Sequence, residues 1–312
     1  MTAPPTAKPA GKPGRLRRFW RVNGAGYLFV APSLVFFTIF IFIPLGWSFL
    51  LSFQDFGLRG SVFIGLDNYL HLINDRIFHQ AAFNTVVYSV FTVGVWVLVS
   101  MALATLIHPL PHRLRTFFRA AYYLPAVTSA VFIALVWKWV LNANPWGLAN
   151  YVLSLFGAGP VGFISDPSPF LGANVALWSV ILSSVLTIPA VGVVLYSAAL
   201  AAIPQELYEA AESEGAGALA KFRYVTVPLL KPVTLYVAVI YTIAAFEVFE
   251  RVYVMTGGGP GYATHTIVYL IWRTGFRFTE YGLASAQAFL LFAVIATISI
   301  VQFRALRSDV EY

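Results

Sequence analysis

The sequence has no cysteine and few charged residues, and each shortage excludes a class of protein. Without cysteine, the 312 residues contain no disulfide framework, thiolate metal site or cysteine nucleophile. Charged residues make up 11% of the chain, against about 25% in an ordinary soluble domain. The 59% hydrophobic content also excludes disorder, which needs low hydrophobicity and high charge. This composition, with a mean hydropathy of +0.76, favours one helical membrane body over a cytosolic enzyme.

Long apolar stretches are what the sequence does contain. Crossing about 30 Å of hydrocarbon requires roughly 20 apolar residues in a helix, and six stretches reach that length. We therefore predict an all-α membrane protein with six transmembrane helices. Pro44 in the first and Pro189 in the fourth predict kinks, because proline removes a helical hydrogen bond. The predicted spans are 27–53, 85–107, 120–141, 172–202, 233–255 and 283–303.

Lysine and arginine are unevenly distributed among the segments that join these spans. Fourteen of the 20 lie in the two terminal tails and in the second-to-third and fourth-to-fifth connections, whereas four lie in the opposite loops. The positive-inside rule then places both termini in the cytoplasm. Residues 1–25 are expected to form a basic, disordered tail and residues 26–312 the transmembrane domain. The net charge of +7 follows from this topology and indicates no nucleic-acid partner.

One predicted cytoplasmic loop, residues 203–232, is too polar to span the membrane. Pro204 suits the first turn of a helix and Gly215 suits its end, and apolar residues recur at helical spacing from there to Pro228. We expect a short helix, a glycine turn and a second short helix. The small residues would let another protein approach closely, and four glutamates offer ion-pair partners. An amphipathic segment lying on the membrane surface fits the same pattern.

The residue pattern of this loop resembles the EAA loop of ABC-importer permease subunits. Glu214 stands where aspartate is commoner, and Val227 precedes Pro228 where leucine is usual, so both departures are mild. Other stretches resemble the carbohydrate-type permeases of the maltose and glycerol-phosphate group, and the resemblance covers nearly everything after residue 25. The matching segments are Glu209-Ala210-Ala211, Gly215-Ala216, Pro228, Gly65-Leu66-Asp67-Asn68-Tyr69, Asn84-Thr85 and the YVMTGGGPG segment over 253–261.

The resemblance implies a type I ABC importer transmembrane fold in the bacterial cytoplasmic (inner) membrane. Such a chain provides an alternating-access path for a sugar or polyol derivative. The implied partners are a second permease subunit, which would complete a heterodimer, two cytoplasmic ATPases and an external substrate-binding protein. ATP and Mg are expected on the ATPases, with no cofactor in this chain. The coupling residues carried over are Glu209, Ala210, Ala211, Glu214, Gly215, Ala216 and Pro228.

Motifs for covalent or metal chemistry are missing. The sequence has no G-x-x-x-x-G-K-[ST] phosphate loop, HExxH zinc motif or G-x-S-x-G nucleophile elbow. His108 and His112 are four apart, but the prolines between them prevent a shared helical face. We therefore expect no catalytic residue and no metal site, which disfavours a membrane enzyme. The glycine run at residues 257–261 is expected to be a flexible external loop.

Three charged residues, Glu247, Glu250 and Arg251, fall inside the fifth predicted span. Each charge at mid-membrane costs about 2.5–3.5 kcal/mol on insertion scales, so the three need partners or water. On a continuous helix they share one face, and Glu247 and Arg251 are spaced for an ion pair. Two interpretations remain open: a structural ion pair, or a water-filled path whose carboxylates accept hydrogen bonds from sugar hydroxyls. The alternative function is an ion-coupled secondary transporter, which predicts paired repeats with acids in both halves.

Overall fold

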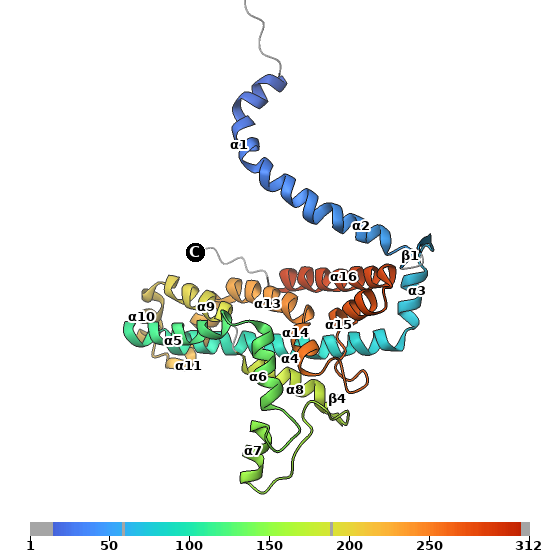
Figure 1. Ribbon diagram of the computed structural model, residues 1–312. Helices are drawn as coiled ribbons and strands as arrows, with labels where there is room; N and C mark the ends of the chain where they lie inside the picture. Colours follow the sequence, from blue (N-terminus) through green and yellow to red (C-terminus); the bar gives the residue numbers. More distant parts are fainter. Residues whose placement is uncertain (1–14, 58–59, 188–189, 307–312) are drawn as a thin grey trace, which may run out of the picture. The chain divides into compact units, whose positions relative to one another are not determined.

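The computed structural model describes residues 15–57, 60–187 and 190–306, and it is mostly helical (Figure 1). The chain divides into two compact units, Met1–Leu51 and Ser52–Tyr312. The first unit contains α1 (Arg15–Phe37), the π-helical turn η1 (Thr38–Phe42) and α2 (Ile43–Leu51). α1 begins at Arg15 and so includes part of the 1–25 segment, whereas residues 1–14 lie outside the described residues.

Pro44 modifies the helix of the first unit without ending it. Gly26–Leu51 remains one helix of span length. The hydrogen bonding changes from α to π over Thr38–Phe42, directly ahead of the proline. A proline has no N–H for the regular i to i−4 bond, and a π-helical turn accommodates that loss locally.

The second unit contains two small β-hairpins and the remaining helices. Its strands are β1 (Gln54–Gly57), paired antiparallel with β2 (Gly60–Phe63), and β3 (Pro169–Phe170), paired antiparallel with β4 (Ala173–Asn174). Its helices are α3 (Asp67–Asn74), α4 (Arg76–Ile107), α5 (His112–Ala126), α6 (Ala130–Val140), α7 (Leu148–Leu155), α8 (Val175–Leu186), α9 (Ala190–Ala202), α10 (Gln205–Ser213), α11 (Ala218–Lys221), α12 (Val227–Leu229), α13 (Lys231–Phe246), α14 (Glu250–Met255), α15 (Ile267–Trp272) and α16 (Tyr281–Leu306), with π-helical turns η2 (Phe222–Thr226) and η3 (Arg273–Arg277).

α4 is the central helix of this unit and packs against α8, α9, α13 and α15 (Figure 1). It begins at Arg76 because the Asp75 side chain accepts a hydrogen bond from the Ile77 backbone N–H at 2.9 Å, as an N-cap residue does. Two buried clusters lie along it. One surrounds Tyr88 and includes residues of α8, α13 and α14, and the other surrounds Tyr196 and includes residues of α4, α9 and α13.

The expected count of six spans is not confirmed in the described part of the chain. Four helices are long and apolar enough to cross a membrane: Gly26–Leu51, Arg76–Ile107, Lys231–Met255 and Tyr281–Ala305. A fifth is added if α8 and α9, which meet at 41°, form one bent span. The predicted span over 120–141 is divided between α5 and the 11-residue α6. Ser129 between them has an extended ψ of 132°, and serine favours such helix starts over helix interiors.

The fourth predicted span is broken at the place where a kink was expected. Pro189 itself lies outside the described residues, but α8 ends at Leu186 and α9 begins at Ala190. The fifth predicted span is also interrupted, since α13 ends at Phe246 and α14 begins at Glu250. Backbone groups freed by such breaks at membrane depth require partners inside the protein. At both breaks, the backbone therefore has to be held by contacts with other parts of the protein.

Candidate functional site

The loop over residues 203–232 folds as the sequence predicts, into a short helix, a glycine turn and a second short helix. α10 ends in a Schellman motif: the Ala216 N–H donates to the Ala211 carbonyl and the Gly215 N–H donates to the Glu212 carbonyl, both at 2.9 Å. Gly215 has a φ of +81°, which is the left-handed conformation that glycine adopts without a steric penalty. The chain can therefore turn within the four residues 214–217 and enter α11.

Both ends of this loop are fastened to the core of the second unit. Ile203, before α10, and Leu230, after α12, are buried in the cluster around Tyr196. Tyr208 in α10 packs on the same cluster, and its hydroxyl lies 3.0 Å from the Thr226 hydroxyl in η2. The loop is therefore held at both ends, and through Tyr208 in α10, against the cluster that contains residues of α9 and α13.

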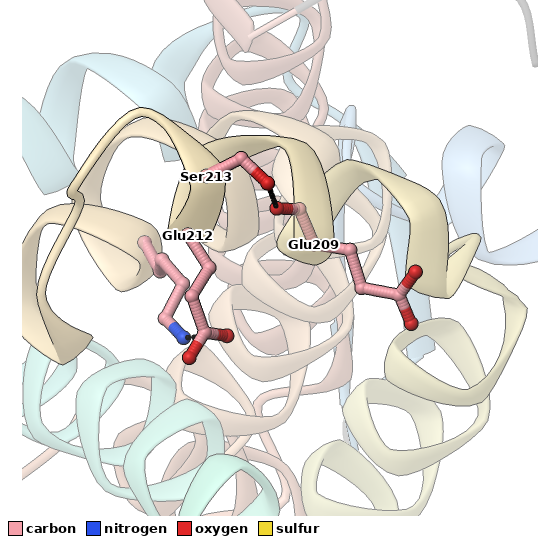
Figure 2. Close-up of polar contacts among 4 residues, drawn as sticks. Glu209, Glu212 and Ser213 are labelled. Carbon is pink, nitrogen blue, oxygen red and sulfur yellow. Dashed lines mark hydrogen bonds and ion pairs between the residues drawn. The ribbon is translucent and has the colours of Figure 1, made fainter.

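The outward surface of the loop combines carboxylates with large apolar side chains. Lys221 and Glu212 form an ion pair at 3.1 Å, and the Ser213 hydroxyl donates to the Glu209 carbonyl at 3.0 Å (Figure 2). The Glu209 carboxylate points away from Glu212 in this view and has no ion-pair partner among the described residues. Ala210, Glu214 and Pro228 are exposed, and Ala211, Gly215 and Ala216 line the turn. The large apolar side chains that are exposed are Leu207, Leu219, Tyr224 and Val227.

The predicted ion pair between Glu247 and Arg251 is not formed. The interruption at residues 247–249 removes the continuous helix that the four-residue spacing presupposes, so the charges do not share one helical face. Both Glu247 and Glu250 are exposed within the chain, whereas Arg251 is partly buried. Glu247 and Arg251 are therefore not paired in this arrangement, and both carboxylates remain exposed.

Arg251 instead supports the broken end of α8. Its Nη1 donates to the Ser183 carbonyl at 3.0 Å, and Trp96 Nε1 of α4 donates to the Ser184 carbonyl at 3.0 Å. These carbonyls belong to the last turn of α8, at the negative end of the helix dipole, where they also accept hydrogen bonds from the Thr187 hydroxyl and N–H. A guanidinium is well suited to that position because it carries several donors and a permanent positive charge. Sequence periodicity alone did not connect Trp96 or Arg251 with this break.

The glycine run at 257–261, which the sequence predicts to be a flexible external loop, makes specific hydrogen bonds to neighbouring side chains. The Tyr269 hydroxyl donates to the Gly257 carbonyl at 2.6 Å, and the Thr264 hydroxyl donates to the Gly259 carbonyl at 2.9 Å. Gly257 and Gly258 have φ values of +60° and +82°, so glycine is required there for a compact turn. The glycines therefore allow this tight turn.

Asn84 and Thr85, near the start of α4, hold the far end of the same loop. The Asn84 amide donates to the carbonyls of Tyr262 and His265 at 3.2 and 2.9 Å, and the Thr85 hydroxyl accepts from the Ile267 N–H at 2.9 Å. Both side chains are buried. In the sequence, this contact is indicated by the two polar residues Asn84 and Thr85 at the start of an apolar stretch, a position that favours a specific polar contact.

His265 is a buried histidine whose tautomer follows from its two contacts. Arg273 Nη1 lies 2.9 Å from Nε2, and because arginine only donates, Nε2 must accept. Nδ1–H then donates to the Gly258 carbonyl at 2.8 Å. Burial lowers the pKa of His265, the Gly258 hydrogen bond opposes that shift, and the facing Arg273 guanidinium lowers the pKa further. A neutral imidazole is therefore part of the folded loop.

Acidic conditions should weaken the fold of this loop through His265. Its native pKa lies below the ordinary value of about 6.5, so the unfolded chain binds the proton more readily. Stability is complete above about pH 6.5 and is lost as the pH falls through the native pKa. Thermal unfolding midpoints of detergent-solubilised protein at neutral and acidic pH should show this decrease. His265→Gln should flatten the pH dependence, whereas His71→Gln on exposed α3 should leave it unchanged; equal slopes in all three proteins would contradict the assignment.

Comparisons with known proteins give consistent results over nearly the whole chain, although no family model matches it. The chain is 31% identical over 307 residues to the arabinooligosaccharides transport system permease protein AraP of Bacillus subtilis, covering 97% of this chain and 95% of that one. It is 32% identical to the trehalose/maltose transport system permease protein MalF of Thermococcus litoralis, covering 91% and 94%. It is 31% identical to the sn-glycerol-3-phosphate transport system permease protein UgpA of Escherichia coli, covering 95% and 98%.

A solved structure shares the fold of this chain. The crystal structure of a bacterial ABC transporter involved in importing the acidic polysaccharide alginate matches with a TM-score of 0.78 at 23% identity. The match covers 95% of this chain and 100% of that one. A second crystal structure, of the bacterial alginate ABC transporter in complex with a periplasmic protein that holds an alginate pentasaccharide, matches with the same TM-score at 24% identity. The fold of this chain is therefore shared with solved structures.

Proposed function

Because the chain belongs to the family of sugar ABC transporter permeases, we propose that it is the membrane-spanning subunit of an ATP-driven importer for a sugar or polyol derivative. The observation that carries the proposal is the loop over 203–232. It presents exposed glutamates and apolar side chains outward while Ile203 and Leu230 anchor it in the core. Such a surface fits a cytoplasmic ATPase that moves the loop as it binds and hydrolyses ATP. The chain's own role is transport without covalent chemistry.

The points at which the loop over 203–232 is anchored determine how its movement would reach the other helices. α10 rests on the cluster around Tyr196, and α13 begins directly after the loop at Lys231. Movement of the loop is expected to tilt α9 and α13 together against α4. The breaks between α8 and α9 and between α13 and α14 then supply places where these segments bend, because the helical backbone hydrogen bonding is already interrupted there. Alternating access would use these two breaks as hinges.

The path for the substrate is proposed to run beside the break between α13 and α14. Glu247 and Glu250 are exposed there and can accept hydrogen bonds from hydroxyl groups. Next to them, the Tyr253 and Trp272 rings lie 4.9 Å apart and offer aromatic faces of the kind that pack on sugar rings. Arg251 is held by the Ser183 carbonyl, so we assign it to the wall of this path and not to direct substrate binding.

The other components of the transporter are expected to be separate chains. The proposed complex contains this subunit, a sister permease, two ATPases that hold ATP and Mg, and an external substrate-binding protein. The bias of lysine and arginine toward the tails and two connections places the loop over 203–232 and both termini in the cytoplasm. The complex would lie in the bacterial cytoplasmic membrane. No metal or cofactor is assigned to this chain.

Co-purification tests this proposal directly. Affinity-tagged chain, extracted in mild detergent from its own cells, should retain an ATPase and a second permease, and the preparation should hydrolyse ATP. Glu250→Ala should keep this assembly but lower substrate uptake, since it removes only a path carboxylate. If the chain purifies without an ATPase and its uptake follows an ion gradient, the ion-coupled secondary transporter is the correct alternative. If Glu250→Ala disrupts assembly as much as uptake, the carboxylate is structural.

A further inference from the structure

The short helix α7 presents its apolar face outward. Leu148, Tyr151, Val152 and Leu155 are exposed by 44%, 56%, 44% and 66%. Their spacing of three, four and seven residues places them on one helical face. A helix on a water-facing surface has the opposite arrangement, with its apolar stripe against the core. We call these four residues the α7 stripe.

The opposite face of α7 is fixed by a buried amide. Asn150, only 2% exposed, donates through Nδ2 to the Asn142 carbonyl at 2.9 Å and to the Val161 carbonyl at 3.0 Å. Its Oδ1 accepts from the Val161 N–H at 2.8 Å. Turning the stripe inward would break all three bonds and leave buried polar groups unpaired. The outward direction of the stripe is therefore built into the fold.

The surroundings of α7 indicate a lipid surface. The sequence from Trp139 to Ser165 contains no lysine, arginine, aspartate or glutamate. The connection that contains α7, residues 142–171, carries a single charge, Asp166, whereas the other two segments expected on the external side carry several, among them Asp55, Asp67 and Asp75 in one and Arg273, Arg277 and Glu280 in the other. A water-soluble binding protein meets surfaces with a polar rim, and those two segments supply one. The uncharged α7 segment does not.

Continuity with the short apolar helix α6 also supports a lipid surface. Ala149 of α7 packs in a cluster with Trp137 and Val140 at the outer end of α6. α6 carries exposed Lys138 and Trp139 at that end, a combination typical of the headgroup region. Trp146 and Phe156, which flank α7, are exposed by 82% and 83%. The apolar surface thus continues from the outer end of α6 across α7.

We propose that α7 lies in the outer surface of the bilayer, with the α7 stripe at the boundary between headgroups and acyl chains. The proposal rests on the proposed function, because the external position of α7 follows from the importer topology. α7 then anchors the connection between α6 and α8 in the membrane, next to the broken span. The absence of lysine and arginine means that binding depends on apolar contact and not on anionic lipid.

Site-directed spin labelling tests this placement, and the natural lack of cysteine makes it direct. Single nitroxides at Val152→Cys and Leu155→Cys would be compared with Ser154→Cys on another face of α7 and His71→Cys on exposed α3. The intact complex is reconstituted in phosphatidylcholine vesicles, and collisions with oxygen and with a water-soluble nickel chelate are measured. The ratio of oxygen to nickel collisions should be severalfold higher at residues 152 and 155 than at 154 and 71.

Two results would overturn the proposal. Ready access of nickel to residues 152 and 155 would place the stripe in water, and protection from both reagents, or protection that appears on adding the binding protein, would place it against protein. ATPase co-purification with each cysteine variant is measured separately. A lipid-exposed stripe in a chain that retains no ATPase would refute the importer assignment while leaving the membrane placement standing.

Discussion

Substrate uptake should fall to background when Glu209 is replaced by lysine or Gly215 by aspartate. Glu209 presents a carboxylate without an ion-pair partner among the described residues, so Glu209→Lys reverses a charge that only a partner protein would sense. Gly215 has open space around its Cα but a φ of +81°. A side chain there strains the turn, and an aspartate adds negative charge beside the C-terminus of α10. Both changes act on the outward surface and not on the core.

Uptake by whole cells, with the amount of subunit in the membrane fraction measured in parallel, checks this prediction. Glu209→Gln removes the charge without reversing it and should retain partial uptake. Gly215→Asn is the matched control for the turn, because asparagine tolerates the left-handed conformation and carries no charge. Full uptake in both Glu209→Lys and Gly215→Asp would refute the role of this loop in coupling.

Gly192→Ala should cause the largest loss of stability. Gly192 lies in α9 where it faces α4 and α13, and an added Cβ would overlap the Tyr241 hydroxyl and lie 2.8 Å from the Ser100 Oγ. Tyr241 accepts a hydrogen bond from the Gly192 N–H at 2.9 Å and is 3.1 Å from the Ser100 hydroxyl. All three groups are buried, so the overlap cannot be relieved at the surface. Overpacking of this kind costs about 1–3 kcal/mol or more.

The matched control for this change is Gly94→Ala in α4. A Cβ at Gly94 would have nothing within 4 Å. Alanine is favoured over glycine inside a helix by about 1 kcal/mol, so this variant should be neutral or more stable. Thermal unfolding in detergent, followed by loss of monodisperse protein, compares the two. Equal unfolding midpoints for Gly192→Ala and Gly94→Ala would show that the contact between α4, α9 and α13 is looser than the structure indicates.

Features encoded by neighbouring residues could be predicted from the sequence. The apolar runs at 85–107, 233–255 and 283–303 correspond to helices of span length. The two short helices around Gly215 were also predictable, because a proline start and a glycine end act within a few residues. The resemblance of the same loop to the EAA pattern then led to the family that the relatives confirm.

Features that depend on distant partners could not be predicted in this way. The spacing of Glu247 and Arg251 predicts an ion pair only on an unbroken helix, and the break depends on contacts such as the Thr266 hydroxyl donating to the Val248 carbonyl. The order of the glycine run depends on Asn84, which lies 178 residues away from Tyr262 in sequence. Local periodicity contains no information on such pairs. A polar residue within an apolar run shows where a buried polar contact lies, but it does not identify the residue with which the contact is made.

The contact between Arg251 and the end of α8 also bears on how the chain is made. Ser183 lies 68 residues before Arg251, so its carbonyl has already been synthesised when the arginine emerges. An unpaired arginine at mid-membrane costs about 2.5–3.5 kcal/mol during insertion. Because Ser183 is synthesised before Arg251, the carbonyl that accepts the arginine's hydrogen bond is already present when the charged helix α14 enters the membrane. The order of segments along the gene thus favours correct insertion, and a circularly permuted chain that began between α9 and α13 would have to insert Arg251 before α8 exists.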